Sequence, residues 1–138
     1  NVIVNAIMNE KYFQALEQGS VMVCKINDLA GMTIEDQDIA LLLSNLLNNA
    51  LEACQKCVDE KVIKVKLVQE DDNIVLSVKN TYDGNVITSE GSYITTKKNK
   101  RNHGVGIKNM IQVIEKYDGY YSISYDEKYF SFSCVIPK

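Results

Sequence analysis

The stretch LLLSNLLNNALEA, residues 41–53, restricts the fold more than any other part of the sequence. Its leucines and alanines follow a helical period, so they can cover one face of a sheet. Asparagines interrupt this pattern, although the asparagine amide competes for backbone hydrogen bonds and disfavours helix interiors. On a helical wheel one narrow polar stripe results, formed by Asn45, Asn49, Glu52 and Lys56.

The remaining elements follow from hydrophobic periodicity and from turn residues. Alternation of apolar residues predicts strands, and a period of three to four predicts helices. In chain order we expect a helix at 3–17, a strand at 20–28, a helix at about 36–57, a hairpin from 61–70 and 73–80, a helix at about 106–117, and strands at 120–125 and 129–137.

Residues 81–103 are polar, show no apolar period and are expected to form one long loop. Loops of this length inside a small domain are uncommon and are usually functional. Many antiparallel neighbours and few helices predict an α+β fold. We expect a two-layer sandwich in which helices cover one face of a mixed, mostly antiparallel sheet.

The bulk composition excludes several classes of function. The chain has 138 residues, which suits one domain, and no apolar run approaches the ~20 residues that span a bilayer. A net charge of −3 argues against a nucleic-acid-binding role. Cys54 and Cys57 form a C-x-x-C pair without a second pair or a histidine cluster, so we expect reduced, packing cysteines.

The segment NHGVGIKNM, residues 102–110, is the second unusual feature. Gly104 and Gly106 would let the backbone approach a ligand closely, and a helix that begins there would offer free N–H groups to phosphate. Glycines also mark ordinary loop-to-helix turns. A cationic run precedes them, and it suits polyphosphate or simply a solvated loop: Lys97, Lys98, Lys100 and Arg101.

Together and in this order, NLLNNALEA and HGVGIKNM resemble the N box and the G2 box of the GHKL ATPase/kinase superfamily. The resemblance covers about residues 20–138. It is greatest to the ATP-binding catalytic domains of sensor histidine kinases of the peptide-pheromone (quorum-sensing) receptor type. This resemblance implies the Bergerat ATP-binding fold, with ATP and Mg²⁺ as cofactors and a lid at about 81–103.

The resemblance also implies roles for single residues. Asn49 matches the asparagine that coordinates Mg²⁺, and Asn45 matches a second N-box position near the phosphates. Gly104 and Gly106 match the glycines that hold the lid against the triphosphate. The lid residues with implied phosphate contacts are Thr96, Lys97 and His103.

The chain departs from the superfamily pattern at the adenine site. Most members carry a D-x-G-x-G motif whose aspartate binds the adenine amino group, whereas KNTYDGN here places Asn80 at that position. An asparagine oxygen can still accept the bond, without charge assistance. Asp83 is the competing alignment. Glu52 stands where many histidine kinases have lysine, and it can pair with Lys56 at i, i+4.

A position one turn before the N-box asparagine separates hydrolases from kinases in this superfamily. Gyrase-type members carry a water-activating glutamate there, but this chain has Asn45, which is not a base. The resemblance therefore implies transfer of the ATP γ-phosphate to a histidine outside this chain. Residues 1–18 would be a linker helix from a dimerisation and phosphoacceptor region, and 19–138 the catalytic domain, inactive in autophosphorylation without that region.

The implied context is the cytoplasmic part of a membrane-anchored, homodimeric receptor that acts on a response regulator. Two other readings remain open. A GHKL module that binds nucleotide poorly could serve as an interaction domain, as the altered D-x-G-x-G motif suggests. An anti-sigma-factor type serine kinase shares the N box but fits this lid less well.

Overall fold

The computed structural model describes residues 1–84, 86–89, 92–95 and 100–137, with side chains for 1–84 and 106–137. Its elements follow one another as helix, strand, helix, four strands, helix and two strands. Their bounds are α1 Val2–Glu17, β1 Val21–Ile26, α2 Asp36–Gln55, β2 Val62–Glu70, β3 Asn73–Thr81, β4 Val86–Ser89, β5 Ser92–Thr95, α3 Lys100–Lys116, β6 Tyr120–Tyr125 and β7 Tyr129–Pro137.

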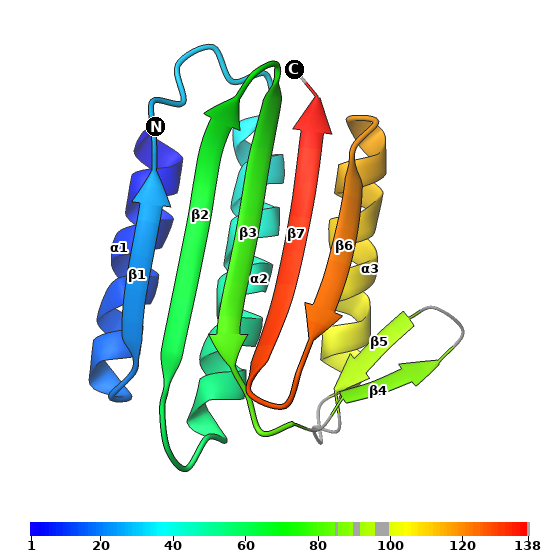
Figure 1. Ribbon diagram of the computed structural model, residues 1–138. Coiled ribbons are helices and arrows are strands. Elements are labelled where there is room, and N and C mark those ends of the chain that lie inside the picture. Colours follow the sequence, from blue (N-terminus) through cyan, green and yellow to red (C-terminus); the bar gives the residue numbers. More distant parts are fainter. Residues whose placement is uncertain (85, 90–91, 96–99, 138) are drawn as a thin grey trace.

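The described strands form one five-stranded sheet in the order β1-β2-β3-β7-β6, plus the separate β4–β5 hairpin. β1 pairs with β2 in parallel and the other pairs of the large sheet are antiparallel. All three helices lie behind this sheet in Figure 1, and the β4–β5 hairpin projects from one lower corner. The predicted α+β sandwich with helices on one face is confirmed.

The core lies between the helices and the sheet. The N-box helix α2 contributes a continuous buried face to it, formed by Ile39, Leu42, Leu43, Leu46, Leu47, Ala50, Leu51 and Cys54. Each fully buried Leu or Ile stabilises the fold by roughly 1.5–3 kcal/mol through the hydrophobic effect. The buried side chains of the sheet that pack in this core include Ile63, Val65, Leu67, Ile74, Leu76, Val78, Phe132, Cys134 and Ile136.

The end of α3 is fixed against the sheet by a tight turn. Asp118 adopts a left-handed conformation with φ 58°, and a Cβ at Gly119 would lie 2.6 Å from the carbonyl oxygen of Val135 in β7. Only glycine fits such a close backbone approach. The predicted end of this helix at about residue 117 is therefore correct.

The expected loop at 81–103 is wrong in two respects. The structure contains the β4–β5 hairpin in this segment, and α3 begins at Lys100 rather than at Gly106. Strands of four residues are too short to show a period, although Val86, Ile87, Tyr93 and Ile94 favour strands. Helix interiors tolerate glycine at a cost of ~1 kcal/mol, so Gly104 and Gly106 do not stop α3.

The first helix buries only some of the apolar residues that its helical period aligns. Val4, Met8 and Ala15 are buried together with Lys11, whereas Tyr12 and Leu16 are exposed. Among the described residues no helix is both long and apolar enough to cross a membrane. All four cysteines are free, and burial raises the pKa of Cys134 to about 12, as expected for a thiol that packs rather than reacts.

Candidate functional site between α2 and α3

The two helices that carry the unusual sequence segments lie side by side and run in opposite directions behind the sheet (Figure 1). They meet where Asn45 of α2 faces Gly106 of α3. A Cβ built on Gly106 would lie 3.6 Å from Asn45 Oδ1 and 3.9 Å from its Cγ. Glycine at 106 therefore leaves the amide oxygen of Asn45 uncovered on that side.

The polar stripe is partly shielded by these surroundings. Asn45, Asn49 and Glu52 are half-buried, whereas Asn48 and Lys56 are exposed. Asn49 and Glu52 both interact with other residues. A half-buried row of amide oxygens is chemically suited to a hard cation such as Mg²⁺, which prefers oxygen ligands and shares them with substrate phosphates.

Asn80 lies at the end of β3 and is almost completely buried, with 4% of its surface exposed. Its Nδ2 donates a hydrogen bond to the carbonyl oxygen of Thr81 at 3.0 Å. Within the described part of the chain, no donor bonds to its Oδ1. The oxygen thus keeps its capacity to accept a hydrogen bond from a ligand.

Thr81 connects this position to the N-box helix. Its Oγ1 accepts a hydrogen bond from the backbone N–H of Val62 at 3.0 Å and lies 3.4 Å from the Sγ of Cys54 in α2. Burial is the main cause that raises the pKa of the Cys54 thiol. Because Cys54 follows Asn49 by five residues, it lies about 7 Å further along the axis of α2. The end of β3 is therefore held beside the last turns of the helix that carries Asn49.

The structure describes the backbone of only some of the expected lid residues. Thr96 and Lys97 lie outside the described residues. His103 and Gly104 belong to the first turns of α3, so the expected helix start at Gly104–Gly106 is replaced by a start at Lys100. The free N–H groups of the helix therefore belong to residues from Lys100 onward, four to six positions earlier than expected.

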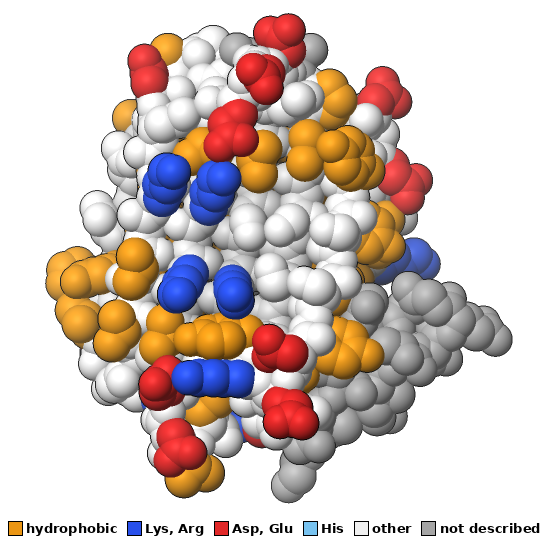
Figure 2. All heavy atoms as spheres, in the orientation of Figure 1, with side chains coloured by type: hydrophobic (Ala, Val, Ile, Leu, Met, Phe, Trp, Pro, Cys, Tyr) orange, Lys and Arg blue, Asp and Glu red, His pale blue; other side chains and the backbone are white. Residues whose placement is uncertain are grey.

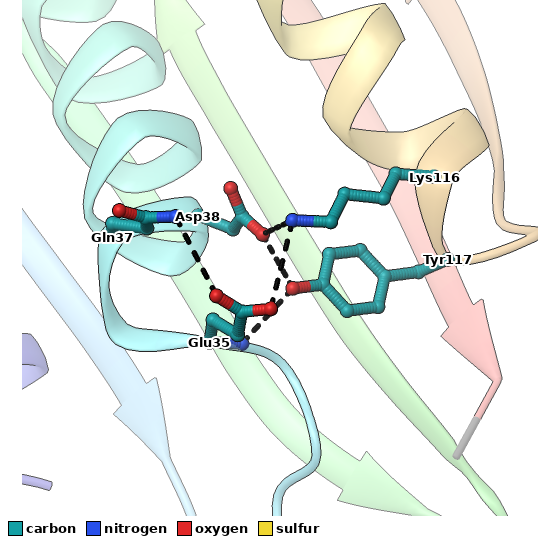
Figure 3. Close-up of polar contacts among 5 residues, drawn as sticks. All are labelled: Glu35, Gln37, Asp38, Lys116 and Tyr117. Carbon is teal, nitrogen blue, oxygen red and sulfur yellow. Dashed lines mark hydrogen bonds and ion pairs between the residues drawn. The ribbon is translucent and has the colours of Figure 1, made fainter.

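A polar cluster at the opposite ends of α2 and α3 was not predicted (Figure 3). Lys116 Nζ lies 2.8 Å from Asp38 Oδ2, and the Tyr117 hydroxyl donates a hydrogen bond to the same oxygen. The Tyr117 hydroxyl also accepts the backbone N–H of Glu35 at 3.1 Å, and Lys116 lies 3.7 Å from Glu35 Oε1. We call these residues, with Gln37, the Asp38 cluster.

The charges in the Asp38 cluster stabilise one another. The hydrogen bonds from Lys116 and Tyr117 hold the pKa of Asp38 below its ordinary value, against the opposing effect of burial. The hydrogen bond that Lys116 donates to Asp38 raises the pKa of Lys116. The pKa of Tyr117 is also raised, mainly by burial and to a smaller extent by the hydrogen bond that its own hydroxyl donates to Asp38. The cluster fixes the start of α2 against the end of α3, about two to three helical turns from Asn45 and Gly106. The acidic first turn was visible in the sequence, but its partners 78 and 79 residues away were not.

Among the described residues no three His, Cys, Asp or Glu side chains come together as a metal cage. The donors near Gly106 and Asn80 are amides, which can share a cation with a bound phosphate but do not form a closed metal site alone.

One protein-family profile matches most of this chain. The profile of the GHKL domain family matches residues 34–137, which include both helices of the site. No protein with a curated description is similar enough in sequence to count as a match.

Several solved structures share the fold. The catalytic domain of histidine kinase ThkA is 19% identical, with a TM-score of 0.70, covering 98% of this chain and 92% of its own. Histidine kinase AdeS from Acinetobacter baumannii is 14% identical with a TM-score of 0.70, and the match covers 99% of this chain and 63% of the AdeS chain. Full-length ShkA in complex with AMPPNP is 13% identical with a TM-score of 0.73, and the match covers 98% of this chain and 29% of the ShkA chain. At these identities the similarity establishes the fold alone.

Proposed function

This chain belongs to the GHKL domain family, and we propose that it is the ATP-binding catalytic domain of a sensor histidine kinase. The observation that carries the proposal is the contact between the N-box helix and the glycine-containing helix, at Asn45 and Gly106. Full-length ShkA, which shares this fold, was crystallised in complex with AMPPNP, an analogue of ATP, and this supports a nucleotide as the ligand.

We assign the parts of ATP to separate residues of the site. Asn49 shares Mg²⁺ with the phosphates, and Asn45 contacts the phosphates from the previous turn of α2. Gly104 and Gly106 permit close approach of the triphosphate, with Thr96, Lys97 and His103 as phosphate contacts from the lid. Asn80 Oδ1 accepts the hydrogen bond of the adenine amino group; this assignment is supported by its free acceptor capacity inside a buried site.

The chemistry of these residues favours phosphoryl transfer over hydrolysis. Asn45 occupies the position of the water-activating glutamate in gyrase-type ATPases, and an amide cannot take a proton from water. Bound Mg²⁺ neutralises charge on the phosphates, and the chain itself contributes positioning, which is the main requirement of phosphoryl transfer. The γ-phosphate then awaits a histidine supplied from outside residues 1–138.

The wider context follows from this function. Residues 1–18 would link the catalytic domain at 19–138 to the dimerisation and phosphoacceptor region, and a response regulator would receive the phosphoryl group. We propose a homodimeric, membrane-anchored receptor of the peptide-pheromone type, with this domain in the cytoplasm. The support for that subtype is the resemblance of residues 49–53, NALEA, to the N-A-x-E-A form that the N box often has in receptors of this type, and of Asn80 to the asparagine that is usual there.

Calorimetric titration of ATP with and without Mg²⁺ tests the proposal. We expect binding that requires Mg²⁺ and weakens at least about tenfold in Asn49→Ala, because one metal ligand is lost. Asn48→Ala is the matched control, since Asn48 is adjacent but exposed. Absence of binding at millimolar ATP would instead favour the interaction-module reading, to which the altered D-x-G-x-G motif points.

A further inference from the structure

The face of the large sheet turned away from the helices carries two parallel rows of polar side chains. The strand registers place the residues of each row side by side across the sheet. One row consists of Lys25, Lys66, Ser77, Ser133 and Ser122, and the other of Lys64, Lys79, Ser131 and Ser124. We call these two rows the lysine–serine band.

Apolar rows border the band on both sides. Above it the registers align Val68, Val75, Val135 and Tyr120, and below it lie Val62 and Tyr129. Figure 2 shows blue side chains in two rows between orange ones, with red side chains beyond them at the upper and lower ends of the face. The exposed acidic residues of the turns at these ends are Glu70, Asp71, Asp72, Asp126 and Glu127.

The lysines of the band lie close together, and the charge of two of them is partly compensated, because Glu70 lies beside Lys66 and the Asp126 carboxylate interacts electrostatically with Lys79. Lys64 and Lys79 stand directly opposite each other in an antiparallel pair, an arrangement in which like charges destabilise a sheet. Lys66 forms an ion pair with Glu70 at 3.2 Å. In the described part of the chain, no carboxylate forms an ion pair with Lys25, Lys64 or Lys79. This positive cluster stands out on a chain with a net charge of −3.

One aromatic ring orders part of the cluster. Lys79 Nζ lies 4.8 Å and Lys64 Nζ 5.7 Å from the centroid of the Tyr129 ring. Cation–π contacts of this kind hold an ammonium group without neutralising its charge. The two lysines are therefore ordered by Tyr129 and still available to an anion. On the other side of the band, Ser133 Oγ donates a hydrogen bond to Ser77 Oγ at 3.0 Å.

We propose that the lysine–serine band binds a short acidic segment of a partner protein, lying across the strands. The carboxylates of the segment would contact the lysines over β1, β2 and β3, and the serine hydroxyls over β3, β7 and β6 would bond to its remaining polar groups. The surface is separate from the proposed nucleotide site, which lies on the helix side of the sheet.

The dimensions of the band favour a short peptide. Five strands spaced ~4.8 Å apart give a width of about 19 Å, which about six extended residues cross at ~3.3 Å each. The acidic turns at both ends of the face would repel a flat anionic membrane that covered the whole face. They would also repel a long nucleic acid, whose binding relies on a broad positive surface. An acidic segment confined to the band avoids both turns.

Fluorescence anisotropy with a labelled peptide of about twelve alternating Asp and Ser residues tests this proposal. We expect saturable binding that weakens as salt is raised from about 0.05 to 0.5 M, because the contacts are screened charges. The Lys64→Glu/Lys79→Glu variant should bind at least about tenfold more weakly. Lys56→Glu/Lys108→Glu makes the same change of charge at two exposed positions, one just after α2 and one in α3, and should bind within about twofold of the parent chain.

A folding control and a comparison with other anionic partners complete the test of the lysine–serine band. If the charge reversal unfolds the chain, as circular dichroism would reveal, Lys64→Gln/Lys79→Gln replaces it and should show the same direction of change. The proposal is overturned if the acidic peptide does not bind, or if both double variants weaken it equally. Tighter binding of an oligothymidine or of phosphatidylserine vesicles, lost on reversal of Lys64 and Lys79, would also overturn it by assigning the band to another class of partner.

Discussion

At the scale of single residues, the candidate site depends on two side-chain amide oxygens that can still accept a hydrogen bond or a cation. Gly106 matters because it has no Cβ in front of Asn45 Oδ1. Asn80 matters because its amide nitrogen is engaged and its oxygen remains an acceptor inside a buried site. Both observations concern acceptor oxygens, which suits a ligand that brings a metal ion and an amino group.

Gly106→Ala separates stability from binding. The new Cβ would meet Asn45 Oδ1 at 3.6 Å, an ordinary contact, so the fold accepts it. Replacing a helical glycine by alanine should raise the free energy of unfolding by about 0.5–1 kcal/mol. The methyl group would cover Asn45 and should weaken Mg-ATP binding. Urea denaturation and calorimetry measure the two effects, and an unchanged affinity would contradict the role given to this contact.

Asp38→Asn should lower the free energy of unfolding by about 1–3 kcal/mol near neutral pH, because it removes the charge that Lys116 and Tyr117 contact. Asp36→Asn, an exposed change in the same helical turn, is the control and should have little effect. Urea denaturation of both variants gives the comparison.

The pH dependence of this difference has a fixed sign. The pKa of Asp38 is lowered in the folded chain, so its stabilising effect is complete above the ordinary carboxyl pKa of about 4. The effect is lost as the pH falls through the lowered pKa. The stability difference between the parent chain and Asp38→Asn should therefore shrink below about pH 4, and a difference that grew in acid would contradict the assigned charge state.

At the scale of elements, the sequence predicted what has a clear period. The N-box helix, the β2–β3 hairpin and the two final strands were correct because each buries one regular face. The β4–β5 hairpin was missed because its strands have only four residues each, and the start of α3 was misplaced because its polar first turn has no apolar period. For the site, the order of the two motifs predicted Asn45 and Gly106 as candidate residues of one site, and the structure places them in contact. Periodicity could not reveal the Thr81 and Asp38 contacts, since they join distant segments.

Thr81→Val tests how the end of β3 is held against α2. The valine keeps the shape but leaves the backbone N–H of Val62 without its acceptor, at a cost of about 1–2 kcal/mol. Thr81→Ser keeps the hydroxyl and should retain most of the stability. If Asn80 contacts adenine, Thr81→Val should also weaken ATP binding more than Thr81→Ser does. Equal behaviour of both variants in denaturation would show that the hydroxyl contributes nothing.

At the scale of the whole molecule, the two proposed binding sites lie on opposite faces of one sheet. The helix side carries the proposed nucleotide site, and the open side carries the lysine–serine band. The sheet between them is held by a continuous core of apolar side chains. Because the two surfaces share no residue, changes in one should leave binding at the other unaffected.

The domain should not phosphorylate itself. Its single histidine, His103, belongs to α3 in the proposed lid region rather than to a separate acceptor helix. Incubation with γ-labelled ATP should therefore leave the chain without acid-labile label and release no steady stream of phosphate. Label that appears on the chain and disappears in His103→Gln would contradict this assignment of roles.

The most direct test of the central claim is a titration with Mg-ATP followed by ¹H–¹⁵N correlation spectra of the 138-residue chain. The proposed site predicts that the side-chain amides of Asn45, Asn49 and Asn80 and the backbone amide of Gly106 shift together with one affinity. Signals of Lys64 and Lys79 on the open face should stay in place. Shifts confined to the open face, or no shifts at millimolar Mg-ATP, would contradict a nucleotide site between α2 and α3.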